Sequence, residues 1–192
     1  MSTIAIVFHS GFGHTKVQAE AVARGARSVA GSAVTLIPVE QAEANAAVLD
    51  PADAIIFGAP TYMGSASAPF KGFMDWSSKV FFGQKWKNKL AAGFTNSGSH
   101  RGDKLNTLVQ MFVFAMQHGM VWVGLGLMPG NHDSKGTPED LNRLGGFAGA
   151  MAQSNTDAGP EIAPPESDRR TAEHLGRRVA EMAARWNPPP SA

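Results

Sequence analysis

The stretch Thr3-Ile4-Ala5-Ile6-Val7-Phe8-His9-Ser10-Gly11-Phe12-Gly13-His14-Thr15 joins a continuous apolar run to a short loop that contains two glycines. The apolar run over 3–8 is rich in β-branched residues, which is typical of a parallel strand buried on both faces. From Thr15 to about Ala30 the chain is alanine-rich and carries a partial helical stripe of valines. We therefore expect a strand, a loop and a helix in direct succession, which is the repeating unit of a doubly wound α/β sheet.

Four further apolar runs alternate with helical segments and extend this pattern along the chain. Strands are expected at 34–39, 54–58, 90–95 and 120–123, and helices at 69–79, at 103–118 and around Leu175, Val179, Met182 and Trp186. Residues 125–165 are rich in glycine and proline and have few apolar anchors, which predicts a long loop. Five strands joined by right-handed crossovers predict a parallel sheet with helices on both faces.

Length and composition exclude several classes of protein. A chain of 192 residues fits one domain, expected over 1–187, with a disordered tail at 188–192. The chain has no cysteine, which excludes a thiolate nucleophile, a Cys-ligated zinc site and an iron–sulfur cluster. The net charge of +1 argues against a nucleic-acid partner.

Targeting and metal signals are weak. The first apolar run is too short for a signal peptide, and no run of about 18 apolar residues predicts a membrane span. We therefore expect a cytoplasmic protein with no membrane partner. His132 and Asp133 are close enough to suggest two metal ligands, but no third ligand is evident, so no metal is expected.

Three polar loops follow predicted strands, at the sheet edge where doubly wound folds bind their ligands. The loop over 10–15 has hydroxyl groups and glycines at the start of a helix, where free backbone N–H groups suit a phosphate. It lacks the Gly-Lys-Ser/Thr sequence of a nucleotide-hydrolysing loop and the third glycine of a dinucleotide fingerprint. The loops over 59–65 and 96–102 have an aromatic, a thioether and small polar residues, which suit a flat heterocycle. Each loop alone is equally compatible with an ordinary turn.

Four motifs in this order resemble the flavodoxin superfamily, and within it the WrbA-type FMN-dependent NAD(P)H:quinone oxidoreductases. They are Ser10-x-x-Gly13-His14-Thr15, Gly58-Ala-Pro-Thr-Tyr-Met-Gly64, Asn96-Ser-Gly-Ser99 and Gln117-His-Gly-Met-Val121. The resemblance extends from Thr3 to about Gly124 and is weaker over 125–165. It implies a flavodoxin-like three-layer fold whose five-stranded parallel sheet has the order 2-1-3-4-5.

The resemblance also implies non-covalently bound FMN and a set of site residues. Those implied to bind FMN are Ser10, Gly11, Phe12, Gly13, His14, Thr15, Pro60, Thr61, Tyr62, Met63, Gly64, Thr95, Asn96, Ser97, Gly98, Ser99, His100, Arg101 and Gln117. Phe12, Phe81 and His118 are implied to contact the substrates. The family often has two histidines where this chain has Gln117 and His118, so these two are the candidates for a catalytic role although FMN carries the chemistry.

The implied function is two-electron transfer from NAD(P)H through FMN to a quinone, in a ping-pong scheme that needs no protein nucleophile. The alternative is a flavodoxin that carries single electrons between proteins. Such carriers are usually strongly acidic, and the isoelectric point near 8.1 favours the enzyme. A response-regulator domain would need a phosphorylatable Asp after the third strand, where this chain has Gly58-Ala59-Pro60. Members of the resembling family are typically tetramers, so a homo-oligomer, either a dimer or a tetramer, is expected.

Overall fold

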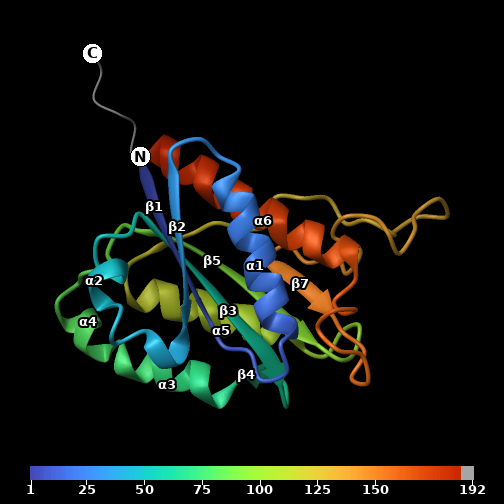
Figure 1. Cartoon of the computed structure of the whole chain (residues 1–192), viewed down its shortest axis with the longest axis horizontal. Helices are drawn as coiled ribbons and strands as arrows, with labels where there is room; N and C mark the ends of the chain where they lie inside the picture. Colours follow the sequence, from blue (N-terminus) through green and yellow to red (C-terminus); the bar gives the residue numbers. More distant parts are fainter. Residues whose placement is uncertain (187–192) are drawn as a thin grey trace.

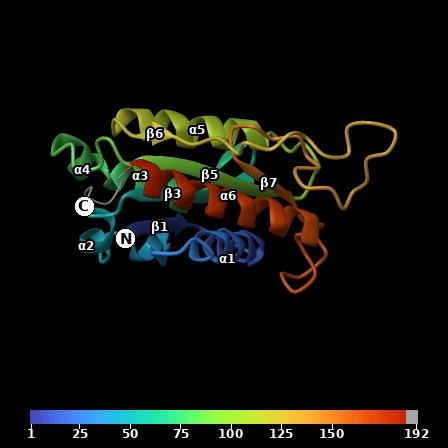
Figure 2. The ribbon, with the colours of Figure 1, turned by 90° about the horizontal axis from the view of Figure 1, so that it is seen from above.

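A sheet of mostly parallel strands lies between two layers of helices, as a computed structural model shows for residues 1–186 (Figures 1 and 2). The strands are β1 (Ser2–Phe8), β2 (Ser32–Pro38), β3 (Ala54–Tyr62), β4 (Ser65–Ala66), β5 (Leu90–Ser97), β6 (Val121–Trp122) and β7 (Ala150–Gln153). The helices are α1 (His14–Arg27), the 3-10 turn η1 (Val39–Gln41), α2 (Ala46–Leu49), α3 (Ala68–Trp76), α4 (Ser78–Phe82), α5 (Lys104–Gln117) and α6 (Glu166–Trp186). The predicted tail at 188–192 lies outside the described residues.

The sheet has the order β2-β1-β3-β5-β6, with β4 paired to β3 and β7 paired to β5. The three-layer α/β fold with a parallel sheet is therefore confirmed. The prediction of five strands is wrong, because the sheet has seven strands and the predicted order does not contain β4 or β7.

The fifth position of the sheet is filled by two separate strands. β6 pairs with Leu90 and Ala91 at the start of β5, and β7 pairs with residues 94–97 at its end. Between them the chain leaves the sheet over 123–149 and extends beyond the helices (Figures 1 and 2). The prediction of a loop over 125–165 is therefore wrong for Ala150–Gln153, which forms β7. The next residue, Ser154, donates its N–H to Ser97 O.

Alternating side chains of β1 separate the two halves of the core. Ile4, Ile6 and Phe8 pack toward α1 and α6, whereas Ala5 and Val7 pack toward α3 and α5. Both sets are buried, as expected for a central parallel strand with helices on both faces.

Two glycines bring α1 and α6 into direct backbone contact. A Cβ atom added at Gly25 would lie 1.8 Å from Glu173 O, and one added at Gly176 would lie 1.9 Å from Val22 O. Neither position has room for a side chain, so the first and last long helices are held at a fixed separation. Within residues 1–186, no helix is long and apolar enough to cross a membrane.

Candidate functional site

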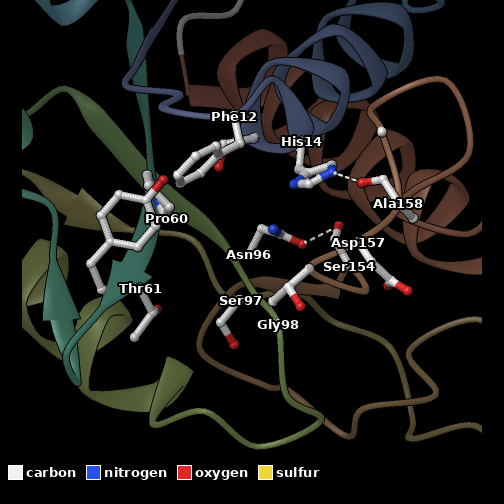
Figure 3. Close-up of a pocket in the computed structure, with 14 residues that line it drawn as sticks. Phe12, His14, Pro60, Thr61, Asn96, Ser97, Gly98, Ser154, Asp157 and Ala158 are labelled. Carbon is white, nitrogen blue, oxygen red and sulfur yellow. Dashed lines mark hydrogen bonds between the residues drawn. The ribbon is translucent and has the colours of Figure 1, made fainter.

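A cleft of about 560 Å³ lies at the carboxyl ends of the strands, between the loops that follow β1, β3, β5 and β7 (Figure 3). Its lining consists of Phe12, His14, Thr15, Pro60, Thr61, Tyr62, Asn96, Ser97, Gly98, Ser154, Thr156, Asp157, Ala158 and Gly159. Its volume falls in the range of about 300–1,000 Å³ that is usual for cofactor sites. Three of the four loops are those predicted from the sequence, and the fourth, over 154–159, was not predicted.

The loop after β1 is shaped to receive a phosphate at the start of α1. Gly13 precedes the helix with φ of 90°, a conformation that favours glycine. A Cβ atom at Gly11 would lie 2.6 Å from the Tyr62 hydroxyl, and one at Gly13 would lie 2.9 Å from Pro160 Cγ. Ser10 Oγ accepts a hydrogen bond from Lys16 N at 3.0 Å. Neither glycine has room for a side chain of its own beside Tyr62 and Pro160. The loop leads directly into α1, whose first backbone N–H groups suit an anion.

The loop after β7 closes the opposite side of the phosphate loop. His14 donates its Nε2–H to Ala158 O at 2.7 Å, so only its Nδ1 atom is left for a ligand (Figure 3). Arg169 of α6 holds the same loop, because its Nε donates to Pro164 O at 2.7 Å and its Nη2 donates to Pro160 O at 3.4 Å. The fourth wall of the cleft therefore depends on the last helix.

Three buried hydroxyl groups support the floor of the cleft. Thr61 Oγ1 lies 2.8 Å from both Thr95 Oγ1 and Thr107 Oγ1. Thr61 lines the cleft, whereas Thr95, which the resemblance implied to bind FMN, is fully buried behind it. Beside them Asn96 Oδ1 accepts a hydrogen bond from Ser154 Oγ at 2.9 Å (Figure 3). The amide nitrogen of Asn96 is therefore the group left to donate to a ligand.

Two aromatic rings form the wall on the β3 side. The Phe12 and Tyr62 rings are 6.2 Å apart at an angle of 72°, and Phe12 is 75% exposed. Partial burial raises the pKa of Tyr62, and a hydrogen bond with the Gly11 backbone lowers it in part, so the phenol is neutral at physiological pH. Met63 and Gly64 lie at the tip of this loop with φ of 47° and 80°, and the Met63 side chain is fully exposed.

The remaining predicted residues are outside the cleft of a single chain. Ser10, Gly11 and Gly13 adjoin the lining residues of the first loop but do not line the cleft themselves. Ser99, His100 and Arg101 are exposed and continue the β5 loop beyond its lining. The structure does not bring Phe81, Gln117 and His118 to the cleft, and they line a second cavity of about 470 Å³ between α3, α4 and α5. Sequence spacing placed them on helix ends but could not tell which cavity those ends face.

His118 is the polar centre of this second cavity. Its Nε2 donates to Ser77 Oγ at 2.9 Å, and Ser77 Oγ donates to Met74 O at 2.7 Å. Burial among aromatic rings lowers the pKa of His118 to about 4, so the ring is neutral at physiological pH. Within residues 1–186, no group of three or more His, Cys, Asp or Glu residues is placed to hold a metal ion.

The chain matches known proteins along most of its length. Residues 21–132 match the family model described as NADPH-dependent FMN reductase. The chain is similar to flavodoxin FldP of Pseudomonas aeruginosa, with 42% identity over 95% of this chain and 97% of that protein. It is 32% identical to an NAD(P)H dehydrogenase (quinone) of Archaeoglobus fulgidus, over 95% of this chain and 98% of that protein. A crystal structure of a WrbA-like flavodoxin from Agrobacterium tumefaciens superposes with a TM-score of 0.77 and 41% identity, over 97% of this chain and all of that one.

The chain belongs to the flavodoxin superfamily, in its WrbA-type branch. The prediction of an FMN-binding oxidoreductase of this family is thereby confirmed. The cleft fits the cofactor on its own chemistry, because the start of α1 offers backbone N–H groups for a phosphate and the Asn96 amide nitrogen is left to donate at the β5 side of a cavity of about 560 Å³.

Proposed function

We propose that this protein transfers electrons in pairs from NAD(P)H to quinones, with FMN bound in the cleft at the carboxyl ends of the strands. The observation that carries the proposal is that a loop at the start of α1, two aromatic rings and the polar residues Asn96, Ser97 and Gly98 line one cavity of about 560 Å³. When bound, FMN would supply the redox chemistry, and the chain would supply binding, orientation and electrostatics.

Each part of the cleft has a role in this proposal. Backbone N–H groups and hydroxyls over 10–15 would bind the phosphate without a charged side chain. Tyr62 and Phe12 would contact the ring system, and the exposed face of Phe12 would leave room for nicotinamide. The Asn96 amide nitrogen and the backbone around Ser97 and Gly98 would donate hydrogen bonds to the ring edge where negative charge develops.

The second candidate is a flavodoxin that carries single electrons between partner proteins. It is supported by the 42% identity with flavodoxin FldP. The isoelectric point near 8.1 favours the enzyme, because carriers that dock on basic partners are usually strongly acidic.

We also propose that the chain works as a single domain in the cytoplasm and as a homo-oligomer, a dimer or a tetramer. One face of α5 carries five apolar side chains that are 40–57% exposed: Leu105, Val109, Phe112, Val113 and Met116. A row of this kind is typical of a subunit interface. In an oligomer the neighbouring second cavity, with Phe81, Gln117 and His118, would approach a partner's cleft and contact the quinone there.

The deciding experiment is a visible absorption spectrum of protein reconstituted with FMN and desalted, followed in the same cuvette by NADH or NADPH and then benzoquinone. We expect retained flavin absorbance that bleaches with the nicotinamide and recovers with the quinone. Retained flavin that does not respond to either nicotinamide would instead support the electron carrier. Loss of the flavin on desalting would contradict the assignment of the cleft.

A further inference from the structure

Lys104, in the first turn of α5, is a lysine with only 1% of its surface exposed. Its ammonium group points back into the loop that follows β5. It donates hydrogen bonds to the carbonyl oxygens of Ser99, of His100 at 3.1 Å and of Arg101 at 3.5 Å. One buried cation therefore binds three successive carbonyl groups of a loop whose first residues line the cleft.

The two preceding carbonyl groups of this loop are also bound by the protein. Ser97 O accepts from Ser154 N at 3.1 Å, and Gly98 O accepts from Gln153 Nε2 at 2.8 Å. The C=O and N–H groups of a trans peptide point in opposite directions. The N–H groups of 98–102 are therefore turned away from these donors, and within residues 1–186 none of them donates to another protein group. Successive free N–H groups of this kind form a concave site for negative charge.

The charge of Lys104 is not cancelled by its neighbours. The charged groups that face it are Asp168 of α6 and Arg143 of the segment between β6 and β7. Asp168 already accepts two hydrogen bonds of 2.8 Å from Arg143 and one of 2.8 Å from Gln153 N. These three groups together retain one positive charge. Burial lowers the pKa of Lys104 to about 8, so the ammonium form still predominates at neutral pH.

We propose that Lys104 is a positioning residue that fixes the 97–102 loop, so that the Gly98 N–H at the cleft lining is held toward the flavin edge with the cation behind it, and that it thereby favours the reduced cofactor over the oxidised one. A bound flavin would gain one negative charge on accepting hydride, and the fixed loop with the Lys104 cation behind it would stabilise that charge. This inference rests on the proposed function, because it assumes that FMN occupies the cleft.

The test compares Lys104→Met and Lys104→Gln with Lys89→Met as a matched control. Lys89 is also a partly buried lysine, and its Nζ donates to Ala52 O at 2.6 Å, but it precedes β5 at the opposite end of the sheet. Two quantities are measured for each protein: the FMN dissociation constant by fluorescence quenching of the flavin, and the midpoint potential of the bound flavin as a function of pH.

We expect Lys104→Met to bind oxidised FMN about tenfold more weakly, because three carbonyl groups lose a charged donor. We expect its midpoint potential to fall by about 30 mV, which is the two-electron equivalent of a further tenfold loss for the reduced form. Lys104→Gln should recover part of the FMN affinity that Lys104→Met loses, but its midpoint potential should stay as low as that of Lys104→Met. The potential of the parent protein should decline more steeply above about pH 8, where Lys104 loses its charge, and neither Lys104 variant should show this change of slope.

A Lys104→Met protein with the parent's affinity and potential would overturn this inference and leave the proposed function intact. Equal shifts in Lys89→Met would overturn it as well, because the effect would then be one of general stability. If Lys104→Met does not fold, as judged by circular dichroism, the midpoint potential of Lys104→Gln is the test: a value equal to the parent's would overturn the inference. A parent protein that does not bind FMN would overturn the proposed function and this inference together.

Discussion

The two cavities of this chain have similar volumes, about 560 and 470 Å³, but they are built from different parts of the fold. The cleft is made by loops at the ends of strands, so its polar groups are largely backbone amides and hydroxyls. The second cavity is made by side chains of α3, α4 and α5 around a buried neutral His118. Asp157 also lines the first cavity, so an anionic group there would be bound on the side of the 10–15 loop, by backbone N–H and hydroxyl groups. The second is suited to an apolar ring or another subunit.

The largest expected effect is that of Gly13→Asp, which tests whether the phosphate loop belongs to the cleft. The added side chain would meet Pro160 and place a negative charge where we propose that the phosphate binds. We expect FMN affinity to fall by about 100-fold or more, from lost N–H contacts and charge repulsion. A fluorescence titration of the apoprotein with FMN measures this change in the dissociation constant.

Gly31→Asp is the control for that change, because Gly31 also has a positive φ, of 79°, but has no neighbour within 4 Å and precedes β2. Both variants should lose about 1 kcal/mol of stability from the backbone conformation alone. Equal FMN affinities in the two proteins would show that the phosphate lies elsewhere.

An intermediate effect is expected for Thr61→Val, which tests whether Thr61 contacts the cofactor or only supports the core beneath the cleft. Thr107→Val removes the other end of the same 2.8 Å hydroxyl contact, but Thr107 lies on α5 and does not line the cleft. Both variants should lose about 1–2 kcal/mol in urea unfolding, because Thr107→Val leaves one buried hydroxyl, and Thr61→Val leaves two, with one partner fewer. Only Thr61→Val should weaken FMN binding, by about tenfold. The same dissociation constant for both variants would mean that Thr61 supports the floor without meeting the cofactor.

The smallest effect on FMN binding is expected for Phe81→Ala, which tests the second cavity. The FMN dissociation constant should change by less than about twofold, whereas kcat/KM for benzoquinone should fall by about five- to tenfold if a partner's cleft uses this ring. Phe82→Ala is the control, because Phe82 contacts Phe81 at 5.5 Å between ring centroids but is 83% exposed and does not line the cavity. Quinone kinetics that are unchanged in Phe81→Ala would remove the second cavity from the reaction.

The sequence was informative about the cleft because its signals are local. A buried strand followed by Ser10-Gly11-Phe12-Gly13 specifies both the strand and the turn, and loops that follow parallel strands must meet at one edge of the sheet. The fourth loop gave no such signal. β7 is the short segment Ala150–Gln153, which has no β-branched residue, and Ser154 meets Asn96 only through pairing across 58 positions of sequence.

The role of Lys104 was likewise not predictable from local pattern. A lysine at the start of an amphipathic helix is usually solvent-exposed. Here it is buried because the loop over 97–103 folds back over it and offers three carbonyl groups. Phe81 and His118 illustrate the same limit, since helical spacing fixes which residues share a face but not which cavity that face meets.

The backbone contact between α1 and α6 at Gly25 and Gly176 has a consequence for biosynthesis. Residues 154–159 are the last cleft-lining segment to be translated, and Arg169 of α6 binds the carbonyl groups of Pro160 and Pro164 in the segment that follows them. A nascent chain that has emerged only as far as β5 carries three walls of the cleft and lacks the fourth. If FMN occupies the cleft as proposed, its complete site forms only after translation has passed α6, when the last helix has docked against the first.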